Sequence, residues 1–184
     1  MTALRRWQGA LVLAVALLLV GLLQLPFQQS SSDTRWYAGV PGKTVATETV
    51  AVQVDRPRFA TTVTVNSKSY ETSDVFVVLD VRIDLIREVV RLQPWLVTTD
   101  GYRYASRGIG GEPLVSAQGF ASQGVLVFEV PRERIAGAIV EFEPIRDVDT
   151  YAGRIRIDNA FPAPPPPGDH SEDLPAQPRT LVRP

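Results

Sequence analysis

The amino-acid sequence predicts an all-β sandwich that follows one N-terminal membrane-spanning helix. Residues 75–85 carry an apolar side chain at every second position, which is the pattern of a half-buried strand. Further short apolar stretches alternate with turn-forming residues at intervals of about 8–12 residues. Residues 7–25 form an almost uninterrupted apolar run. No helical pattern separates the expected strands, which disfavours a parallel α/β sheet.

The strand at residues 75–85 anchors this interpretation. Its odd-numbered residues are all Val, Leu or Ile, and most are β-branched, which favours an extended backbone. Charged residues alternate with them in the second half: Asp80, Arg82 and Asp84. In the first half, Phe76 and Val78 make the second face apolar as well. We therefore expect a long central strand that is covered on both faces near Phe76, and a partner sheet that covers its continuous apolar face.

Composition excludes several kinds of chemistry. The chain has 184 residues, with 19 Lys and Arg against 20 Asp and Glu, so no nucleic-acid partner is expected. It contains no cysteine, which excludes disulfides, thiolate nucleophiles, zinc–thiolate sites and lipid attachment to an N-terminal cysteine. Its one histidine, His170, lies in a polar tail, which disfavours a Ser–His arrangement. We expect no cofactor and no metal, and the sequence identifies no small-molecule substrate.

The first 25 residues predict a membrane anchor. Residues 1–8 contain Arg5 and Arg6 and no acid, and are expected to be cytoplasmic. The transmembrane helix is expected from Gly9 to Leu25. With residues 7 and 8 it would span roughly 28 Å, close to a bilayer core of about 30 Å. The preceding arginines place the N-terminus inside and the rest of the chain outside.

A cleaved signal peptide is the alternative interpretation of this segment. The small residues at 30–32 could form a cleavage site, and the protein would then be secreted. That site lies farther from the apolar run than is usual, which favours the anchor.

Residues 26–43 are expected to be a juxtamembrane linker. In it, Trp36 and Tyr37 could lie at the membrane interface or form the first part of the core. The sandwich itself is expected to occupy residues 44–159. Its strands are expected at residues 44–55, 59–65, 75–85, 95–99, 102–105, 125–130, 138–143 and 154–157, with a short one at 114–117. Seven to nine strands at this spacing predict an immunoglobulin-like β-sandwich.

Breaking residues separate these strands. Pro57 interrupts the first pair, because proline cannot donate to a central ladder. Residues 66–69 form a turn-like cluster, and Asp100 with Gly101 is a strong hairpin signal. Residues 160–184 are rich in proline and poor in apolar residues, so we expect a disordered tail. A proline-rich ligand or a spacer toward the cell wall is the functional alternative.

Two segments resemble a known family. Residues 96–104 read as a strand, an Asp-Gly turn and a tyrosine, and residues 124–131 as glycine, an apolar strand and Phe-Glu-Val-Pro. Over residues 45–157 the chain resembles a family of bacterial immunoglobulin-like domains of unassigned function. These are common in membrane-anchored and lipid-anchored proteins of Gram-positive bacteria and actinobacteria, and are related in fold to a secreted mycobacterial antigen.

The resemblance implies a sandwich outside the cell and supplies no catalytic residues. The chain departs from lipid-anchored members by its lack of cysteine. It also has Ile86, Arg87 and Glu88 where an Asn-type turn is expected.

Several groups of residues resemble parts of known kinds of site. Gly42, Lys43 and Thr44 resemble the end of a phosphate-binding loop, but Tyr37 stands where that motif needs glycine. Asp147 and Asp149 could chelate a divalent cation, although a surface turn is the simpler interpretation.

Three further groups lie in expected strands and turns. Glu141 and Glu143 share one strand face, which indicates a solvent face more simply than a carboxylate pair. Ser-Lys chemistry at residues 67–69 would lack the burial that activates lysine. A basic patch for anionic lipid or wall polymer could be formed by Arg56, Arg58, Arg103 and Arg107.

The sequence thus favours a non-enzymatic, membrane-anchored, extracytoplasmic domain that binds another envelope protein. One alternative is an accessory subunit of a membrane transporter or secretion complex, in which Gly9 and Gly21 allow close helix packing. Another is an enzyme with an unrecognised carboxylate site. Because loops commonly carry function, the possible binding residues are Asp100, Gly101, Arg107 and Gly108.

Overall fold

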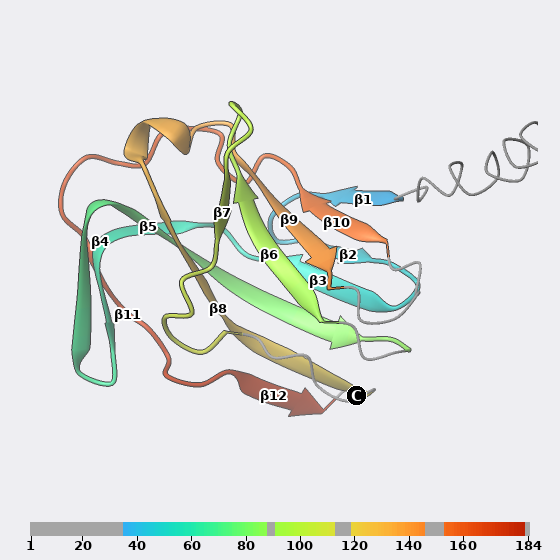
Figure 1. The fold of residues 1–184 in the computed structure, drawn as a ribbon. Helices are drawn as coiled ribbons and strands as arrows, with labels where there is room; N and C mark the ends of the chain where they lie inside the picture. The colour runs from blue at the N-terminus through green and yellow to red at the C-terminus, as the bar shows by residue number, and fades with distance from the viewer. Residues whose placement is uncertain (1–34, 88–90, 113–118, 146–152, 183–184) are drawn as a thin grey trace, which may run out of the picture. The chain divides into compact units, whose positions relative to one another are not determined.

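The computed structural model describes residues 35–87, 91–112, 119–145 and 153–182, which form two β-sheets packed as a sandwich (Figure 1). The all-β prediction is therefore confirmed for this part of the chain. The expected transmembrane helix from Gly9 to Leu25 and the expected cytoplasmic residues 1–8 lie outside the described residues. Within the described ranges, no helix has the length and apolar character of a membrane span.

Sheet A has five strands and is antiparallel except at one edge. Its β1 strand pairs in parallel with β10, so the first and last strands of this sheet run side by side in the same direction. The other neighbours pair antiparallel. Across the sheet the order is β1 (Trp36–Gly39), β10 (Arg154–Ile157), β9 (Ile139–Pro144), β6 (Leu92–Val97) and β7 (Arg103–Ala105).

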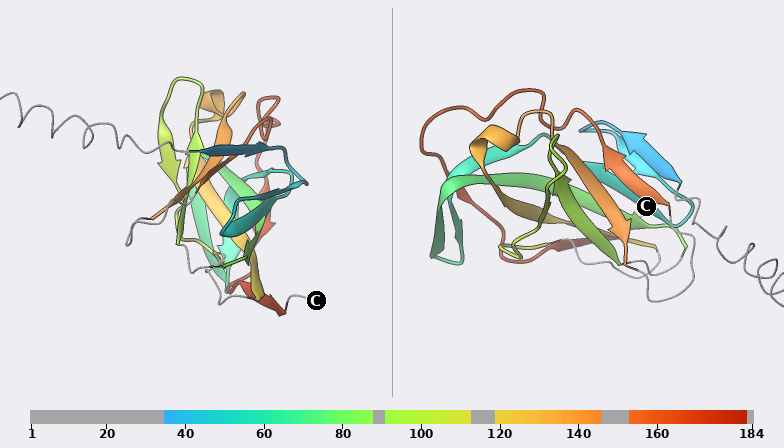
Figure 2. Two further views of the ribbon diagram at one scale, coloured as in Figure 1. Left: turned by 90° about the vertical axis from the view of Figure 1, so that its right-hand side faces the viewer. Right: turned by 45° about the horizontal axis from the view of Figure 1, so that its top comes forward.

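Sheet B has seven strands arranged around one long strand, β5 (Lys68–Leu85). On one side β5 pairs with β8 (Phe120–Val130). On the other side it pairs with β4 (Arg58–Val65) along its first half and with β3 (Val50–Val54) along its second. The outer strands are β2 (Thr44–Ala46), β11 (Ser171–Asp173) and β12 (Arg179–Val182). The two layers are visible in the views of Figure 2.

The break between β3 and β4 lies where Pro57 predicted it. Both strands follow the same edge of β5, and the Asp55 N–H donates to the Asp80 carbonyl at 2.9 Å inside the gap. Strand β5 is longer than expected because its hairpin with β4 continues to a two-residue turn. At that turn Asn66 and Ser67 have φ of 49° and 64°, the left-handed values of a tight hairpin. The continuous strand β5 thus pairs along one edge with both β3 and β4, which Pro57 separates.

The core between the sheets is built from the alternation seen in the sequence. Val77, Leu79 and Val81 of β5 are fully or almost fully buried and face side chains of sheet A such as Leu96 and Phe142. The intervening Asp80, Arg82 and Asp84 are only half-buried. Burial of these apolar side chains removes their surface from water and supplies the main stabilising force.

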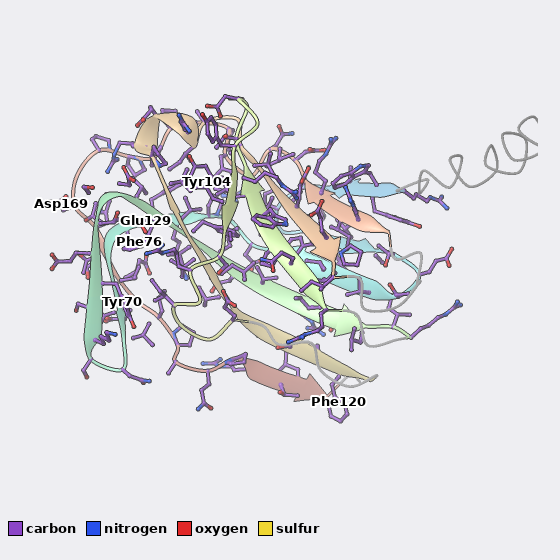
Figure 3. The ribbon with its side chains drawn as sticks, viewed as in Figure 1. Tyr70, Phe76, Tyr104, Phe120, Glu129 and Asp169 are labelled. Atoms are coloured by element: carbon purple, nitrogen blue, oxygen red, sulfur yellow. The ribbon has the colours of Figure 1, made fainter. Side chains whose placement is uncertain are left out.

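A second apolar cluster lies on the opposite face of sheet B. Phe76 and Val78 of β5 are buried there beside Val127 of β8 (Figure 3). The cluster is covered by Ile109, from the loop after β7, and by Leu174, which follows β11. The expectation that β5 is covered on both faces near Phe76 is confirmed.

The N-terminal boundary differs from the expected start at residue 44. Strand β1 lies within the expected linker, and Tyr37 packs against the core whereas Trp36 is 41% exposed. Gly39 explains the close approach of β1 to β2, because a Cβ there would lie 2.0 Å from a methyl group of Val45. A strand of four residues with one partly buried ring is too short to give a recognisable alternation.

The C-terminal boundary also differs. Residues 160–184 were expected to be disordered, but β11 pairs with β4 and β12 pairs with β8. Phe161 and Leu174 are buried. The expectation of an unpaired tail therefore does not hold for residues 160–182. These strands are held mainly through backbone hydrogen bonds to sheet edges, which composition does not reveal.

Smaller differences concern strand ends. Strand β8 begins at Phe120 rather than at 125, because polar residues such as Gln123 continue the pairing. Strand β6 includes Pro94, at a position beyond the end of the β7 ladder. The Asp100–Gly101 hairpin is confirmed: the Gly101 N–H donates to the Thr98 carbonyl at 2.9 Å, and Gly101 has φ of 86°. The short strand expected at 114–117 lies outside the described residues.

Candidate functional site

The outer face of sheet A gathers aromatic and charged side chains from all five strands. Because neighbouring strand residues point to opposite faces, the residues between the core positions face outward here. The pairing aligns Trp95 with Glu141, Glu141 with Arg156, and Trp36 with Arg154. The residues of this surface, called the A-face below, are Trp36, Ala38, Gln93, Trp95, Arg103, Glu141, Glu143, Arg154 and Arg156.

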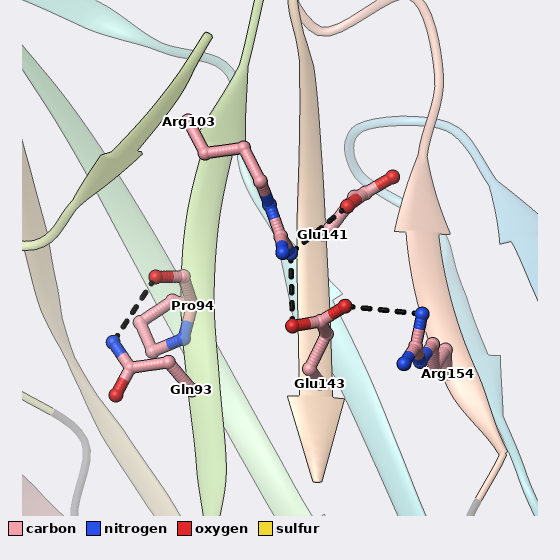
Figure 4. Close-up of polar contacts among 6 residues, drawn as sticks. All are labelled: Gln93, Pro94, Arg103, Glu141, Glu143 and Arg154. Atoms are coloured by element: carbon pink, nitrogen blue, oxygen red, sulfur yellow. Dashed lines mark hydrogen bonds and ion pairs between the residues drawn. The ribbon is translucent and has the colours of Figure 1, made fainter. Parts of the chain in front are cut away.

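A chain of ion pairs crosses the A-face (Figure 4). An Arg103 guanidinium nitrogen lies 3.3 Å from a carboxylate oxygen of Glu141 and 2.9 Å from one of Glu143. The other oxygen of Glu143 lies 3.2 Å from Arg154. Arg103 and Arg154 are about one-third exposed, so water weakens these pairs and each contributes at most about 1 kcal/mol. Their main effect is to fix the side chains in a defined pattern.

The same arginines stack on tryptophans. The Arg103 guanidinium lies 4.7 Å from the ring centre of Trp95, and that of Arg154 lies 5.4 Å from the ring centre of Trp36. Such contacts stabilise by about 0.5–1 kcal/mol at exposed sites. The Trp95 indole nitrogen is buried and has no hydrogen-bond partner among the described residues. The A-face thus presents two aromatic rings, each held by an arginine.

Burial raises the pKa of Glu141 above its usual value. The positive charge of Arg103 opposes this shift, and the negative charge of Glu143 adds to it. The two glutamates share one face, as their spacing predicted. Arg103 lies between them and pairs with both, and Arg154 also pairs with Glu143, so the arrangement is that of an ion-pair network on a partly exposed surface.

A second polar cluster lies at the tip of the β6–β7 hairpin. The Arg134 side chain lies 4.1 Å from the ring centre of Tyr102 and donates to the Tyr104 hydroxyl at 3.2 Å. Its Nε lies 3.6 Å from a carboxylate oxygen of Asp100. A hydrogen bond from the Thr98 hydroxyl, helped by the Arg134 charge, lowers the pKa of Asp100. The Tyr104 hydroxyl raises the pKa of Arg134.

The possible binding residues do not form one site. Asp100 and Gly101 precede β7 at this hairpin tip, whereas Arg107 and Gly108 follow β7. Arg107 lies 3.2 Å from Glu129 and donates its backbone N–H to the Val127 carbonyl at 2.8 Å. The Gly108 N–H donates to the Glu112 carboxylate at 3.2 Å. The second loop is therefore bound along the edge of β8.

The other sequence candidates have structural partners. The Gly42 N–H donates to the Val54 carbonyl at 2.7 Å, and the Lys43 N–H to the Val40 carbonyl at 3.2 Å, so neither amide is available to cradle a phosphate. Ser67 lies in the β4–β5 turn, where Lys68 is exposed and stacks 4.8 Å from the ring centre of Tyr70.

The four arginines considered as a basic patch do not gather into one. Arg58 lies 2.9 Å from Asp80 and 3.6 Å from Glu172. Arg103 and Arg107 pair with the glutamates described above, and Arg56 is exposed. Asp147 and Asp149, the possible cation ligands, lie outside the described residues. The described part of the chain has no group of three or more acidic or histidine side chains placed to hold a metal.

Comparison with known proteins adds little to this geometry. No protein-family model matches the chain, and no curated protein is similar to it in sequence. Among solved structures, it is similar to an uncharacterized β-sandwich protein from Clostridium difficile. That match has 15% sequence identity and a TM-score of 0.43, and covers 71% of this chain and 98% of the other. Similarity at this level supports no transfer of function.

Sequence reasoning singled out Glu141, Glu143, Arg103 and Trp36 separately but did not identify the surface that they share. Glu141 with Glu143 and Arg154 with Arg156 are charged pairs of opposite sign at two-residue spacing in consecutive strands. Opposite charges directly across a hairpin stabilise it, so this pattern is a usable signal. The contributions of Trp95 and Arg103 depend on pairing between strands far apart in sequence.

Proposed function

We propose that the chain is a non-enzymatic, immunoglobulin-like binding domain that is anchored to the membrane and binds another cell-envelope protein through the A-face. The observation that carries the proposal is the pairing of Trp36 and Trp95 with arginines on one half-exposed sheet. Tryptophan, tyrosine and arginine are enriched at protein interfaces and supply most of their binding energy. Arginines already held in place lose less conformational entropy on binding.

The strand order supports the immunoglobulin-like assignment. In that fold, strands B and E are neighbours in one sheet, and C, F and G are neighbours in the other. Here β5 and β8 pair in sheet B, while β6, β9 and β10 are consecutive in sheet A. Their order along the chain matches B, C, E, F and G, with β7 in the place of an added strand after C.

The proposed location of the domain at the outer side of the membrane depends on the sequence alone. The apolar run from Gly9 to Leu25 follows two arginines, which supports one span with a cytoplasmic N-terminus and an extracytoplasmic domain. Secretion after cleavage is the alternative. A reporter fused to the C-terminus tests this: we expect activity only from a reporter that functions outside the cytoplasm, and activity only from a cytoplasmic reporter would contradict it.

Site-specific photo-crosslinking in intact membranes tests the A-face. Ala38 is exposed on the outer side of β1, and Glu71 is an exposed control on sheet B. A crosslinking amino acid at position 38 of the full-length chain should give a discrete adduct with another protein, and the same residue at position 71 should not. Trp36→Ala in the position-38 variant should abolish the adduct.

Two outcomes would contradict the proposed surface: equal adducts from positions 38 and 71, or an adduct at 38 that persists in both Trp36→Ala and Trp95→Ala. Circular dichroism of the purified variants should show unchanged strand content, since both rings lie on the outer face.

A further inference from the structure

The C-terminal residues 171–182 form a strap across the outer face of sheet B. Strand β11 lies outside β4 at one edge of the sheet, and β12 lies outside β8 at the other. Residues 174–178 join them, and Figure 1 shows this segment in red between the two strands. Between the two strands the strap bends at residues 176 and 177.

The strap lies in a closely fitting site, called the seat below, which is formed by the apolar cluster around Phe76, the outer edges of β4 and β8, and Gly111. Leu174 is buried in the apolar cluster, and its N–H donates to the Thr64 carbonyl at 2.8 Å. The Gly111 N–H donates to the Pro175 carbonyl at 2.7 Å. A Cβ at Gly111 would lie 2.3 Å from the carbonyl carbon of Gln177, so the strap lies where only glycine allows it. The seat therefore holds the strap through one buried apolar side chain, that of Leu174, and through backbone hydrogen bonds.

The strap is separable from the core of the domain. The inter-sheet cluster includes none of its described side chains, and Leu174 is the one buried residue among those described. Segments with few buried contacts open locally without global unfolding. An open strap would leave the outer edge of β4 and residues 120–123 of β8 unpaired and would uncover one side of the Phe76 cluster, and such edges readily accept another strand.

The connector that leads to the strap is bent and held. Residues 162–167 are five prolines and one alanine, a composition that favours an extended polyproline conformation. The chain instead bends at residues 162–163 and 167–168, and Gly168 has φ of 108°. Arg132 holds the bend by donating to the Pro166 carbonyl at 2.6 Å. An extended connector would direct the strap away from its own seat.

We propose that the seat is an interaction site for a second copy of this chain, whose strap occupies it in a reciprocal exchange. The segment with the required backbone and side-chain pattern is the strap itself, and an exchanged pair restores every contact of the strap in both copies. The cost is the entropy of association, and it is offset where the connector relaxes to its extended form. The exchange is independent of the A-face.

Single-cysteine crosslinking tests the exchange, because the natural chain has no cysteine. Gln123 and Arg179 are exposed neighbours in the β8–β12 pair. Full-length Gln123→Cys and Arg179→Cys chains, only one of them tagged, are mixed, incubated and oxidised. We expect a disulfide-linked heterodimer several-fold above that formed by Lys43→Cys with Arg179→Cys. The double variant Gln123→Cys/Arg179→Cys shows that the geometry allows the bond.

A heterodimer yield equal to the Lys43→Cys control, with the double variant closing within one chain, would overturn the proposal. Light scattering provides a second measurement. Gly168→Ala strains the bent connector, and Arg132→Ala removes its hydrogen bond, so both should increase the dimer fraction several-fold. Leu174→Asp should decrease the dimer fraction of Gly168→Ala. A strictly monomeric Gly168→Ala chain over the accessible concentration range would also overturn the exchange.

Discussion

The outer faces of the two sheets are built differently although both sheets cover one core. The outer face of sheet B has an apolar cluster around Phe76, and the loop after β7 and the strap cover it with Ile109 and Leu174. The outer face of sheet A carries the ion pairs of Arg103 and Arg154, and its side chains remain partly exposed. Other segments of the chain exclude water from the outer face of sheet B. The charged side chains of the outer face of sheet A remain in contact with water.

The difference is already present in the strand sequences. Residues 75–79 are apolar on both faces, and a strand of this kind needs cover on both sides. Residues 140–143 alternate between apolar and acidic, which leaves one face suited to water. The outer face of sheet B is thus covered by other segments of the chain, whereas the A-face remains in contact with water.

The largest effect is expected from the core that both sheets share. Leu79→Asp would bury an unpaired charge at a fully buried position. The cost of several kcal/mol is comparable to the whole stability of a domain, about 5–15 kcal/mol. We expect loss of the cooperative thermal transition and of the near-ultraviolet circular dichroism signal. Leu79→Met should cost under about 1.5 kcal/mol. A folded Leu79→Asp domain would disprove the assignment of this core.

The covered face should be the next most sensitive. Phe76→Ala should destabilise the domain by about 3–5 kcal/mol in denaturant unfolding, because it opens a cavity under the strap. Phe120→Ala is a matched control, since Phe120 is 38% exposed (Figure 3) and should cost under about 1 kcal/mol. Equal losses would mean that the Phe76 cluster is not packed.

Substitution of Gly111 tests the close packing of the strap against the loop that follows β7. Gly111→Ala should cost about 1–3 kcal/mol, because the new methyl group overlaps the strap backbone at Gln177. Hydrogen exchange should speed up first in β12 and at the β8 amides that pair with it, while the amides of β9 keep their protection. Uniform acceleration across both sheets would argue against a separable strap.

The open face should tolerate change better. Glu143→Gln removes the ion pairs to Arg103 and Arg154 and should cost under about 1 kcal/mol, with a smaller loss at high salt. Glu71→Gln, at an exposed position on sheet B, should stay within about 0.5 kcal/mol. A loss from Glu143→Gln as large as that from Phe76→Ala would contradict the comparison.

The smallest effect concerns pH, and its sign differs between two carboxyls. Folding raises the pKa of Glu141, so its contribution to stability is fully present at low pH and declines as pH rises through the folded pKa. Folding lowers the pKa of Asp100, so its contribution is present above the unfolded pKa and lost as pH falls. From pH 3 to 7, Glu141→Gln should gain stability relative to the natural chain and Asp100→Asn should lose it. Parallel trends would contradict the assigned environments.

Much of the sandwich was predictable because its signals are local. The alternation over residues 75–85, the break at Pro57 and the turn at Asp100 and Gly101 each depend on a few neighbouring residues. The double cover near Phe76 followed from two additional apolar positions. These features use short-range preferences that agree with the final fold.

The edges of the sheets were not predictable in the same way. Strand β11 has three residues, and its parallel pairing with β4 uses backbone groups that every sequence has. The prolines and polar residues around it indicate disorder by composition. A single apolar residue, Leu174, connects the strap with the cluster beneath it, which is too little for a pattern.

The candidate surface was predictable only in part. Glu141 and Glu143 share a face as their spacing indicates. Trp36 in β1 and Trp95 in β6 are aligned with charged residues of the adjacent strands β10 and β9, and that alignment needs the register of the whole sheet. The residues chosen from loops, such as Asp100 and Arg107, proved to be bound to neighbouring elements.

The parallel pairing of β1 with β10 has a mechanical consequence. A pull on the chain ahead of Trp36, resisted at the far end of the domain, acts along β1. It therefore loads the hydrogen bonds across the register from Trp36 to Gly39 together, in shear. Bonds loaded together resist more force than bonds that open one after another, as they would if β1 were peeled from its end. The domain would thus transmit tension through its first strand before any core residue is exposed.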